Sequence, residues 1–171
     1  NHSDVRRKYL DGVISQFDAP YLTHILNYNK ALAQRNALLK NFAENRYFEP
    51  DLLEMWDLKL VELGRLIYEV RKAFIKDFLP IFQRYFNFIS NGNEVVSISY
   101  VSQLELANLT DLLVQNIAKD RAVRYTSVGI HKDDLEFMIS DYPLKKFGSQ
   151  GQQKSFVIAL KLAQFEYMRL V

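Results

Sequence analysis

Apolar side chains recur at helical spacing through the first half of the chain and predict three helices. Residues 4–17 carry one apolar face, made of Leu10, Val13, Ile14 and Phe17. A second helix is expected over residues 21–43 and a third from Asp51 to about Leu79. Because only a short turn separates the two long helices, we expect them to fold back on each other as an antiparallel hairpin.

Two residues interrupt these apolar stripes. Arg35 falls on the apolar face of the second helix, and polar residues at such positions specify helix pairing in coiled coils. A structural role for Arg35 is therefore favoured over a position beside a gap in the packing. Pro80 is expected to kink or end the third helix, because proline removes a hydrogen bond from a helix interior. The helical pattern resumes from Phe82 to Ile89.

Beyond residue 93 the pattern changes to alternation. Residues 94–101 alternate in polarity and are rich in β-branched side chains, which is typical of a strand. Ser102 and Glu105 have the spacing of a capping box and predict a helix over about 103–121. Further strands are expected at 124–128 and 135–139. The fold class predicted is mainly α with a small β component (α+β): a helical hairpin, a few strands and a C-terminal helix.

The C-terminal helix follows a polar stretch that runs from Phe147 to Lys154. Ser149 and Gln152 have the S-x-x-Q spacing of a capping box, and apolar residues then recur at helical spacing to Leu170. Phosphate oxygens bind readily at helix N-termini, because free N–H groups and the helix dipole point there. The stretch is therefore a candidate phosphate site, although capping alone explains these residues without a ligand.

Composition narrows the class of protein. The 171 residues are 49% hydrophobic and 25% charged, with a net charge of +2 that does not demand a nucleic-acid partner. The absence of cysteine excludes a disulfide scaffold and fits a reducing compartment, and we expect a cytoplasmic location without a membrane partner. The chain begins without Met, and we expect a fragment with a helical arm at 1–93 and a returning strand and helix segment at 94–171.

Complete catalytic motifs are missing from the sequence. It contains no G-x-x-x-x-G-K-[ST] phosphate loop, no H-E-x-x-H metal motif and no G-x-S-x-G nucleophile motif. His131 with Asp133 and Asp134 would suit Mg²⁺ or acid–base chemistry, but a polar turn between strands is the simpler interpretation. The basic run Arg6-Arg7-Lys8 is likewise more typical of a solvated helix face than of a phosphate contact.

Several motifs taken together resemble the RecF family of recombination-mediator ATPases, which are ABC-type ATPases related to SMC proteins. They occur in the same order along nearly the whole chain: Arg6–Asp11, Tyr28, Gln34–Lys40, Trp56-Asp57, Gly129–Leu135, Ser149–Lys154 and Ala159–Ala163. The family's phosphate loop lies before the region that these motifs cover, and its acidic Walker B strand lies just after it. The resemblance therefore implies the middle of a RecF protein, with the arm and the signature segment.

The resemblance also implies roles for particular residues. The family's signature motif contacts the γ-phosphate of ATP held by the other protomer, and here it would comprise Ser149, Gln150, Gly151, Gln152 and Lys154. A second family motif, to which no role is assigned, would comprise Gly129, His131, Lys132, Asp133 and Asp134. No catalytic residue or metal ligand is implied within the chain, and the resemblance does not say which residues contact DNA.

Four positions depart from the usual pattern of the family. Ile130 stands where the family usually has Pro, and Lys132 where it usually has Arg. Gln150 and Lys154 occupy positions that Arg often holds. Lys does not reproduce the bidentate contacts of Arg with phosphate, and Gln150 leaves one positive charge fewer beside the nucleotide.

The function implied is that of an ATP-dependent DNA-binding protein of replication, recombinational repair and the SOS response. A full-length protein would bind ATP and Mg²⁺, act as a weak ATPase and form a homodimer on ATP. Its partners would be double-stranded DNA, single-strand/double-strand junctions, a RecR-type mediator and a recombinase. The chain alone is expected to be non-catalytic and to need no cofactor, since it lacks both Walker motifs.

A second hypothesis is a purely structural module. The helical hairpin would then be a protein-interaction or dimerisation element of an SMC- or RecN-like ABC ATPase. Those proteins have much longer coiled coils, and only about 100 residues separate the first helix from the returning strands here. The short arm therefore favours RecF.

Overall fold

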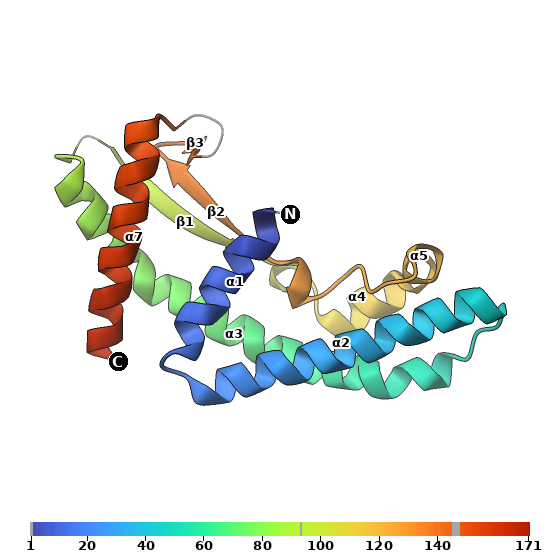
Figure 1. Ribbon diagram of the computed structural model, residues 1–171. Helices are drawn as coiled ribbons and strands as arrows, with labels where there is room; N and C mark the ends of the chain where they lie inside the picture. Colours follow the sequence, from blue (N-terminus) through green and yellow to red (C-terminus); the bar gives the residue numbers. More distant parts are fainter. Residues whose placement is uncertain (1, 93, 145–147) are drawn as a thin grey trace. The chain divides into compact units, whose positions relative to one another are not determined.

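Long helices dominate the computed structural model, which describes residues 2–92, 94–144 and 148–171 (Figure 1). The main helices are α1 His2–Ser15, α2 Ala19–Asn45, α3 Pro50–Ile89, α4 Leu109–Gln115, α5 Ile117–Val123 and α7 Gln150–Leu170. Two 3₁₀ turns are η1 Gln103–Glu105 and η2 Ile130–Lys132, and the strands are β1 Val96–Val101, β2 Asp134–Ile139 and β3 Tyr142–Pro143. The α+β class predicted from the sequence is confirmed.

These elements form two compact units. Unit 1 contains residues 1–17, 71–101 and 134–171, and unit 2 contains residues 18–70 and 102–133. Each unit draws on residues from before and after position 93, and the division of the sequence at 93/94 stays a prediction. Among the described residues, no helix is long and apolar enough to cross a membrane.

Unit 2 is built on the antiparallel hairpin that the sequence predicted. Asp18 begins α2 by accepting a hydrogen bond from the backbone N–H of Tyr21 at 3.0 Å. Arg46 ends the helix in the left-handed conformation, with φ 53°, and lets the chain turn back into α3. Apolar residues from both helices then pack together as a core of Leu39, Phe42 and Leu53, so the hairpin is held by buried apolar surface.

In unit 1, an antiparallel sheet packs with α7 and the later part of α3 around aromatic side chains. The sheet has the order β1-β2-β3, with Tyr100 opposite Leu135 in the first pair of strands. Phe156 of α7 lies at the centre, with its ring centroid 4.6 Å from that of Phe82 in α3 and 5.0 Å from that of Phe137 in β2. This packing fixes α7, and with it the helix start at Ser149.

Of the two outcomes expected at Pro80, a kink or an end of the third helix, the end is wrong. Helix α3 continues through Pro80 to Ile89. Pro80 is exposed to solvent, whereas Phe78, Phe82 and Phe86 on the same helix are buried. Burial of three aromatic side chains outweighs the penalty of about 3 kcal/mol for proline in a helix interior.

The segment between the strands also differs from the prediction. Ser102 accepts a hydrogen bond from Leu104 N–H and starts only a 3₁₀ turn, and the expected helix over 103–121 is divided into η1, α4 and α5. Asn108 caps α4 by accepting from the Asp111 N–H at 2.9 Å. Residues 124–128 form no strand, because their polar groups bond to side chains of unit 2 instead of to a neighbouring strand. The strand expected at 135–139 is confirmed as β2.

Candidate functional site

The polar turn before α7, residues 148–154, forms the capping box predicted from the sequence, and we call it the signature turn. The Ser149 hydroxyl oxygen accepts from the Gln152 N–H at 3.1 Å, and the Gln152 side-chain oxygen accepts from the Ser149 N–H at 2.7 Å. The first N–H groups of a helix have no partner within it, so those of Gln150 and Gly151 point out of the helix end. Phe147, the first residue of the predicted stretch, lies outside the described residues.

Packing within the fold does not require a glycine at position 151 of this turn. It lies exposed in the first turn of α7, where glycine is a poorer helix former than alanine by about 1 kcal/mol. A Cβ atom added at Gly151 would meet only the Ser149 hydroxyl oxygen, at 3.9 Å. Space for a side chain is therefore present, and the glycine instead leaves the backbone open to close approach from outside.

Glu94 contacts the signature turn, and no sequence pattern indicated it. Its carboxylate accepts from the Gln152 side-chain N–H at 2.5 Å, and both residues line a small hollow of about 100 Å³ with Ser140 and Tyr142. Since Gln152 donates to Glu94 and accepts from Ser149, its amide has one defined orientation. Glu94 is separated from Gln152 by 58 residues, and chemistry at such separation leaves no local signal in the sequence.

The second motif, residues 129–134, is held by contacts inside each unit. Gly129 has φ 135° and ψ −179°, a conformation that is essentially restricted to glycine. Its added Cβ would collide with the Tyr28 hydroxyl and lie 2.9 Å from the His131 ring. His131 Nε2 donates to the carbonyl oxygen of Thr126 at 2.8 Å, so Nδ1 accepts from the Tyr28 hydroxyl at 2.9 Å.

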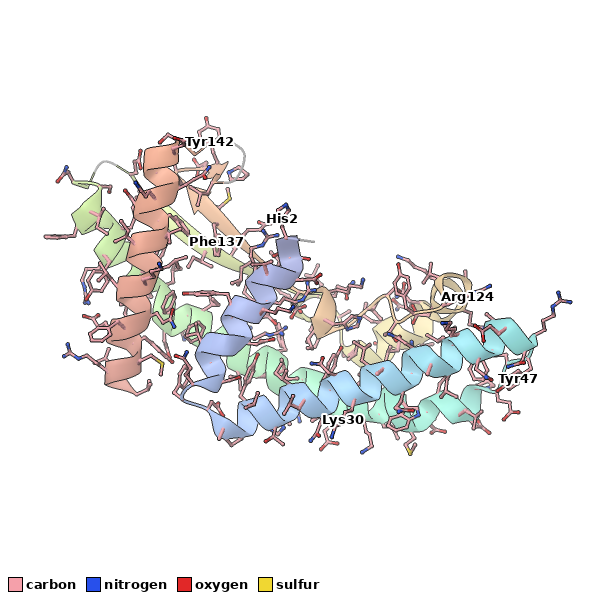
Figure 2. All side chains as sticks on the ribbon, viewed as in Figure 1. His2, Lys30, Tyr47, Arg124, Phe137 and Tyr142 are labelled. Carbon is pink, nitrogen blue, oxygen red and sulfur yellow. The ribbon has the colours of Figure 1, made fainter. Side chains whose placement is uncertain are left out.

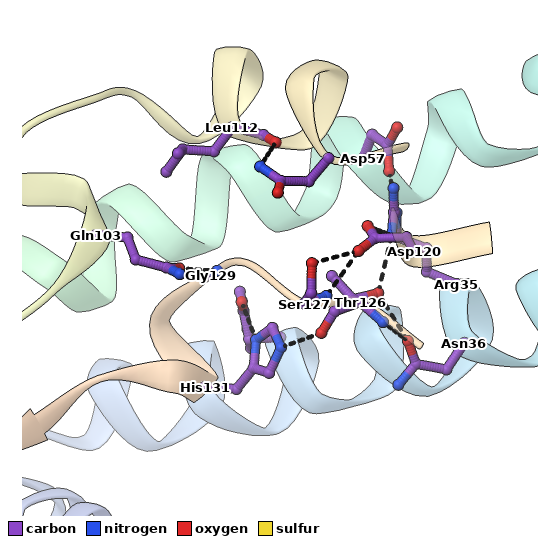
Figure 3. Close-up of polar contacts among 12 residues, drawn as sticks. Arg35, Asn36, Asp57, Gln103, Leu112, Asp120, Thr126, Ser127, Gly129 and His131 are labelled. Atoms are coloured by element: carbon purple, nitrogen blue, oxygen red, sulfur yellow. Dashed lines mark hydrogen bonds and ion pairs between the residues drawn. The ribbon is translucent and has the colours of Figure 1, made fainter. Parts of the chain in front are cut away.

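A buried polar cluster lies beside this motif in unit 2 (Figure 3). We call it the Arg35 cluster; it contains Arg35, Asn36, Asp57, Asp120, Thr126 and Ser127. Arg35 is fully buried and donates to Asp57 at 2.6 Å, to Asp120 at 2.8 Å and to Thr126 at 3.0 Å. The other oxygen of Asp120 accepts from the backbone N–H of Ser127 at 2.9 Å. The structural role predicted for Arg35 is thus seen directly.

The pKa values of two acidic groups near these motifs shift in opposite directions. In unit 1, Arg6 forms two hydrogen bonds to Asp134, at 2.6 and 2.9 Å, and they lower the pKa of Asp134 more than its partial burial raises it. In unit 2, burial raises the pKa of Asp57 and outweighs the opposing effect of Arg35. Arg6 of the basic run therefore serves an ion pair and is not a free phosphate contact.

The side chains that the sequence suggested as Mg²⁺ ligands bond to different protein groups and do not converge on one point. His131 contacts Tyr28 and Thr126, whereas Asp134 contacts Arg6. Within the described part of the chain, no group of three His, Asp or Glu side chains is arranged to hold a metal ion. Lys132 lies on the surface with its Nζ 5.2 Å from the centre of the Tyr125 ring, and Asp133 is 1% exposed.

Comparisons with known proteins identify relatives along the whole chain, although no family model matches it. RecF of Flavobacterium johnsoniae, described as a DNA replication and repair protein, is 53% identical over 98% of this chain and 46% of its own length. RecF of Bacteroides thetaiotaomicron is 44% identical over 98% of this chain and 44% of its own length. The chain therefore spans about half the length of the curated relatives that it matches.

Solved structures agree with the sequence matches. The structure of the recombination mediator protein RecF-ATP in the RecFOR pathway covers 97% of this chain, with a TM-score of 0.89 and 34% identity, over 46% of its own length. A RecF-ATPrS structure gives a TM-score of 0.87 at 33% identity and covers 95% of this chain. The motifs, the fold and the relatives agree: over its length this chain is similar to the RecF proteins in sequence and in fold, and it spans about half of their length.

Proposed function

We propose that the signature turn is one half of a composite ATP site, whose other half lies on a second protomer. The observation that carries this proposal is Gly151, which stands open on a capped helix N-terminus in a chain whose structural relative is a RecF-ATP complex. The N–H groups of Gln150 and Gly151 would donate to the γ-phosphate oxygens, as helix N-termini do for anions. The Ser149 hydroxyl proton is not used by the capping box and would donate as well.

The remaining groups of the turn would orient and stabilise this contact. Lys154 is exposed one turn into α7 and would add positive charge near the phosphate. Glu94 and the capping box would hold the turn in place without reorganisation. When bound, Mg²⁺ would neutralise phosphate charge.

In a full-length protein, the ATP contact would join two protomers into a dimer. The dimer would bind duplex DNA near single-strand gaps and act with a RecR-type mediator to load a recombinase. These partners fit the RecFOR pathway named for the structural relatives and the DNA replication and repair role named for the curated ones. This chain would contribute the arm and the signature turn.

The proposal is tested by Ser149→Arg in a full-length protein that carries this segment. A bulky cation would fill the phosphate position, so sedimentation with ATP should show monomers only. The loss of the Ser149 cap should lower stability by about 1 kcal/mol and leave the fold intact. Asn29→Arg is the matched control, because it adds the same side chain to the exposed surface of α2. An ATP-dependent dimer of Ser149→Arg would contradict the proposal.

A further inference from the structure

One segment of unit 2 exposes charged side chains of a single sign. The segment of residues 117–132, which includes α5, contains Lys119, Arg121, Arg124 and Lys132, and all four are exposed. Its one acidic residue, Asp120, is fully buried and bonded to Arg35 at 2.8 Å. The fold therefore removes the negative charge of this segment from the surface and leaves only cations there. We call residues 117–132 the basic segment.

Aromatic rings lie among these cations. The guanidinium of Arg121 is 3.9 Å from the centre of the Phe48 ring, and Lys132 is 5.2 Å from that of Tyr125. Tyr125 is 45% exposed. Figure 2 labels Arg124 beside α5, where it ends the helix in the left-handed conformation with φ 66°. These cation–π contacts hold the charged groups of Arg121 and Lys132 at the surface of the unit.

Lys59 and Arg65 of α3 do not share this setting. Lys59 lies in the same groove as Glu62, and Arg65 stands three residues after Glu62 and four before Glu69, so that on the helix they are neighbours. Nearby carboxylates offset these positive charges. A polyanion would therefore be attracted to the basic segment rather than to the outer face of the hairpin.

We propose that the basic segment is a contact surface for the phosphate backbone of duplex DNA. The choice of DNA as the polyanion rests on the proposed function. The side chains of Lys119, Arg124 and Lys132 each neutralise a phosphate in the bound state. Such contacts position the protein on DNA without reading sequence, because phosphates are the same at every base pair. Affinity then depends steeply on salt, since each neutralised phosphate releases counterions.

The test uses this chain and a variant that combines Lys119→Gln, Arg124→Asn and Lys132→Gln. Asparagine tolerates the left-handed conformation at position 124, and Arg121 is kept because it packs on Phe48. Duplex DNA binding is measured by fluorescence anisotropy from roughly 25 to 200 mM salt, a range of about one decade that defines the slope of log K against log salt. Removing three phosphate contacts should reduce the slope of log K against log salt by about 2.7.

The matched control combines Lys30→Gln, Lys59→Gln and Arg65→Gln, which removes as many charges from the same unit. Its salt slope should equal that of the parent chain. Thermal unfolding checks that both variants fold. Equal slopes for the parent and the basic-segment variant, equal losses in both variants, or no binding of duplex DNA by the parent would each overturn the inference. So would preferential binding of poly-glutamate, which would make an acidic protein the partner.

The outcomes separate this inference from the proposed function. ATP-dependent dimerisation of a full-length protein depends on the signature turn and is read by sedimentation. The basic segment is read by the salt dependence of DNA binding by this chain. An unchanged salt slope together with a Ser149-dependent dimer would overturn the DNA contact alone, and the reverse pair of results would overturn the composite ATP site alone.

Discussion

The Arg35 cluster and the signature turn are both polar, but they differ in burial and in where their partners lie: Arg35 is paired inside the fold, whereas the turn lies at an exposed helix end. Arg35 is fully buried and reaches Asp57, Asp120 and Thr126 within 3.0 Å. Each of these contacts lies inside unit 2. The cluster is therefore explained by folding, because buried charges must be paired and hydrogen-bonded.

The signature turn is satisfied only in part. Its capping box pairs the N–H groups of Ser149 and Gln152, while those of Gln150 and Gly151 remain directed outward at an exposed helix end. Gly129 and Gly151 differ in the space around them. A Cβ at Gly129 would collide with the Tyr28 hydroxyl, whereas one at Gly151 would meet only the Ser149 hydroxyl oxygen at 3.9 Å. A motif residue with space around it needs an explanation from outside the chain.

The largest effect is expected from Arg35→Met. It leaves the fully buried Asp120 without its cation, and breaking a buried pair in this way should lower the free energy of unfolding by about 3–5 kcal/mol. Urea unfolding measures this loss. Lys40→Met is the control, because Lys40 is exposed on the same helix. The double variant Arg35→Met with Asp120→Asn should recover part of the loss; a stable single variant would remove the distinction drawn between the two regions.

Gly129→Ala should follow in size. The backbone conformation, with φ 135°, and the collision with the Tyr28 hydroxyl should together lower the free energy of unfolding by about 3 kcal/mol. Chemical denaturation of the variant and the parent chain measures the difference. If the alanine variant were as stable as the parent, the second motif would need a role beyond folding.

A smaller, pH-dependent effect is expected at Asp134, which is intermediate between the two regions in exposure. Arg6 lowers the pKa of Asp134 below its ordinary value of 3.8, so the stabilisation is complete above that value and is lost as pH falls through the lower, folded pKa. Asp134→Asn should lose about 1–2 kcal/mol at neutral pH. Its stability should then fall less steeply than that of the parent below about pH 4.

The control for this experiment is Asp141→Asn, because Asp141 is exposed in the turn after β2. Thermal unfolding at a series of pH values from neutral to acid compares the two variants with the parent. Parallel curves for Asp134→Asn and the parent in the acid range would show that the Arg6–Asp134 pair contributes little to stability.

Local chemistry explains which parts of the fold could be predicted. The S-x-x-Q spacing at Ser149 and Gln152 specified a capping box whose two hydrogen bonds lie within four residues, and both are present. Alternation likewise predicted the strand that the structure shows as β1. Arg35 was recognisable as structural because a charge on an apolar stripe is unusual. Such features depend on neighbours in the sequence.

The errors arose where distant contacts decide the structure. Pro80 is tolerated because Phe82 on the same helix packs against Phe156 of α7, far along the chain. The strand expected at 124–128 is replaced by a turn because Asn36 accepts hydrogen bonds from both the N–H and the hydroxyl of Thr126 at 2.7 Å. Glu94, which orients Gln152, was missed for the same reason.

The composite ATP site is tested most directly by Gly151→Ala in a full-length protein, with unfolding and ATP-dependent dimerisation measured on the same sample. The new Cβ fits the fold, so stability should be unchanged or higher by up to about 1 kcal/mol. It also obstructs the approach of a phosphate to the backbone, so ATP-dependent dimerisation, measured by sedimentation equilibrium, should weaken at least about tenfold, or 1.4 kcal/mol. A variant that dimerises with unchanged affinity would contradict the assignment of the signature turn to the nucleotide.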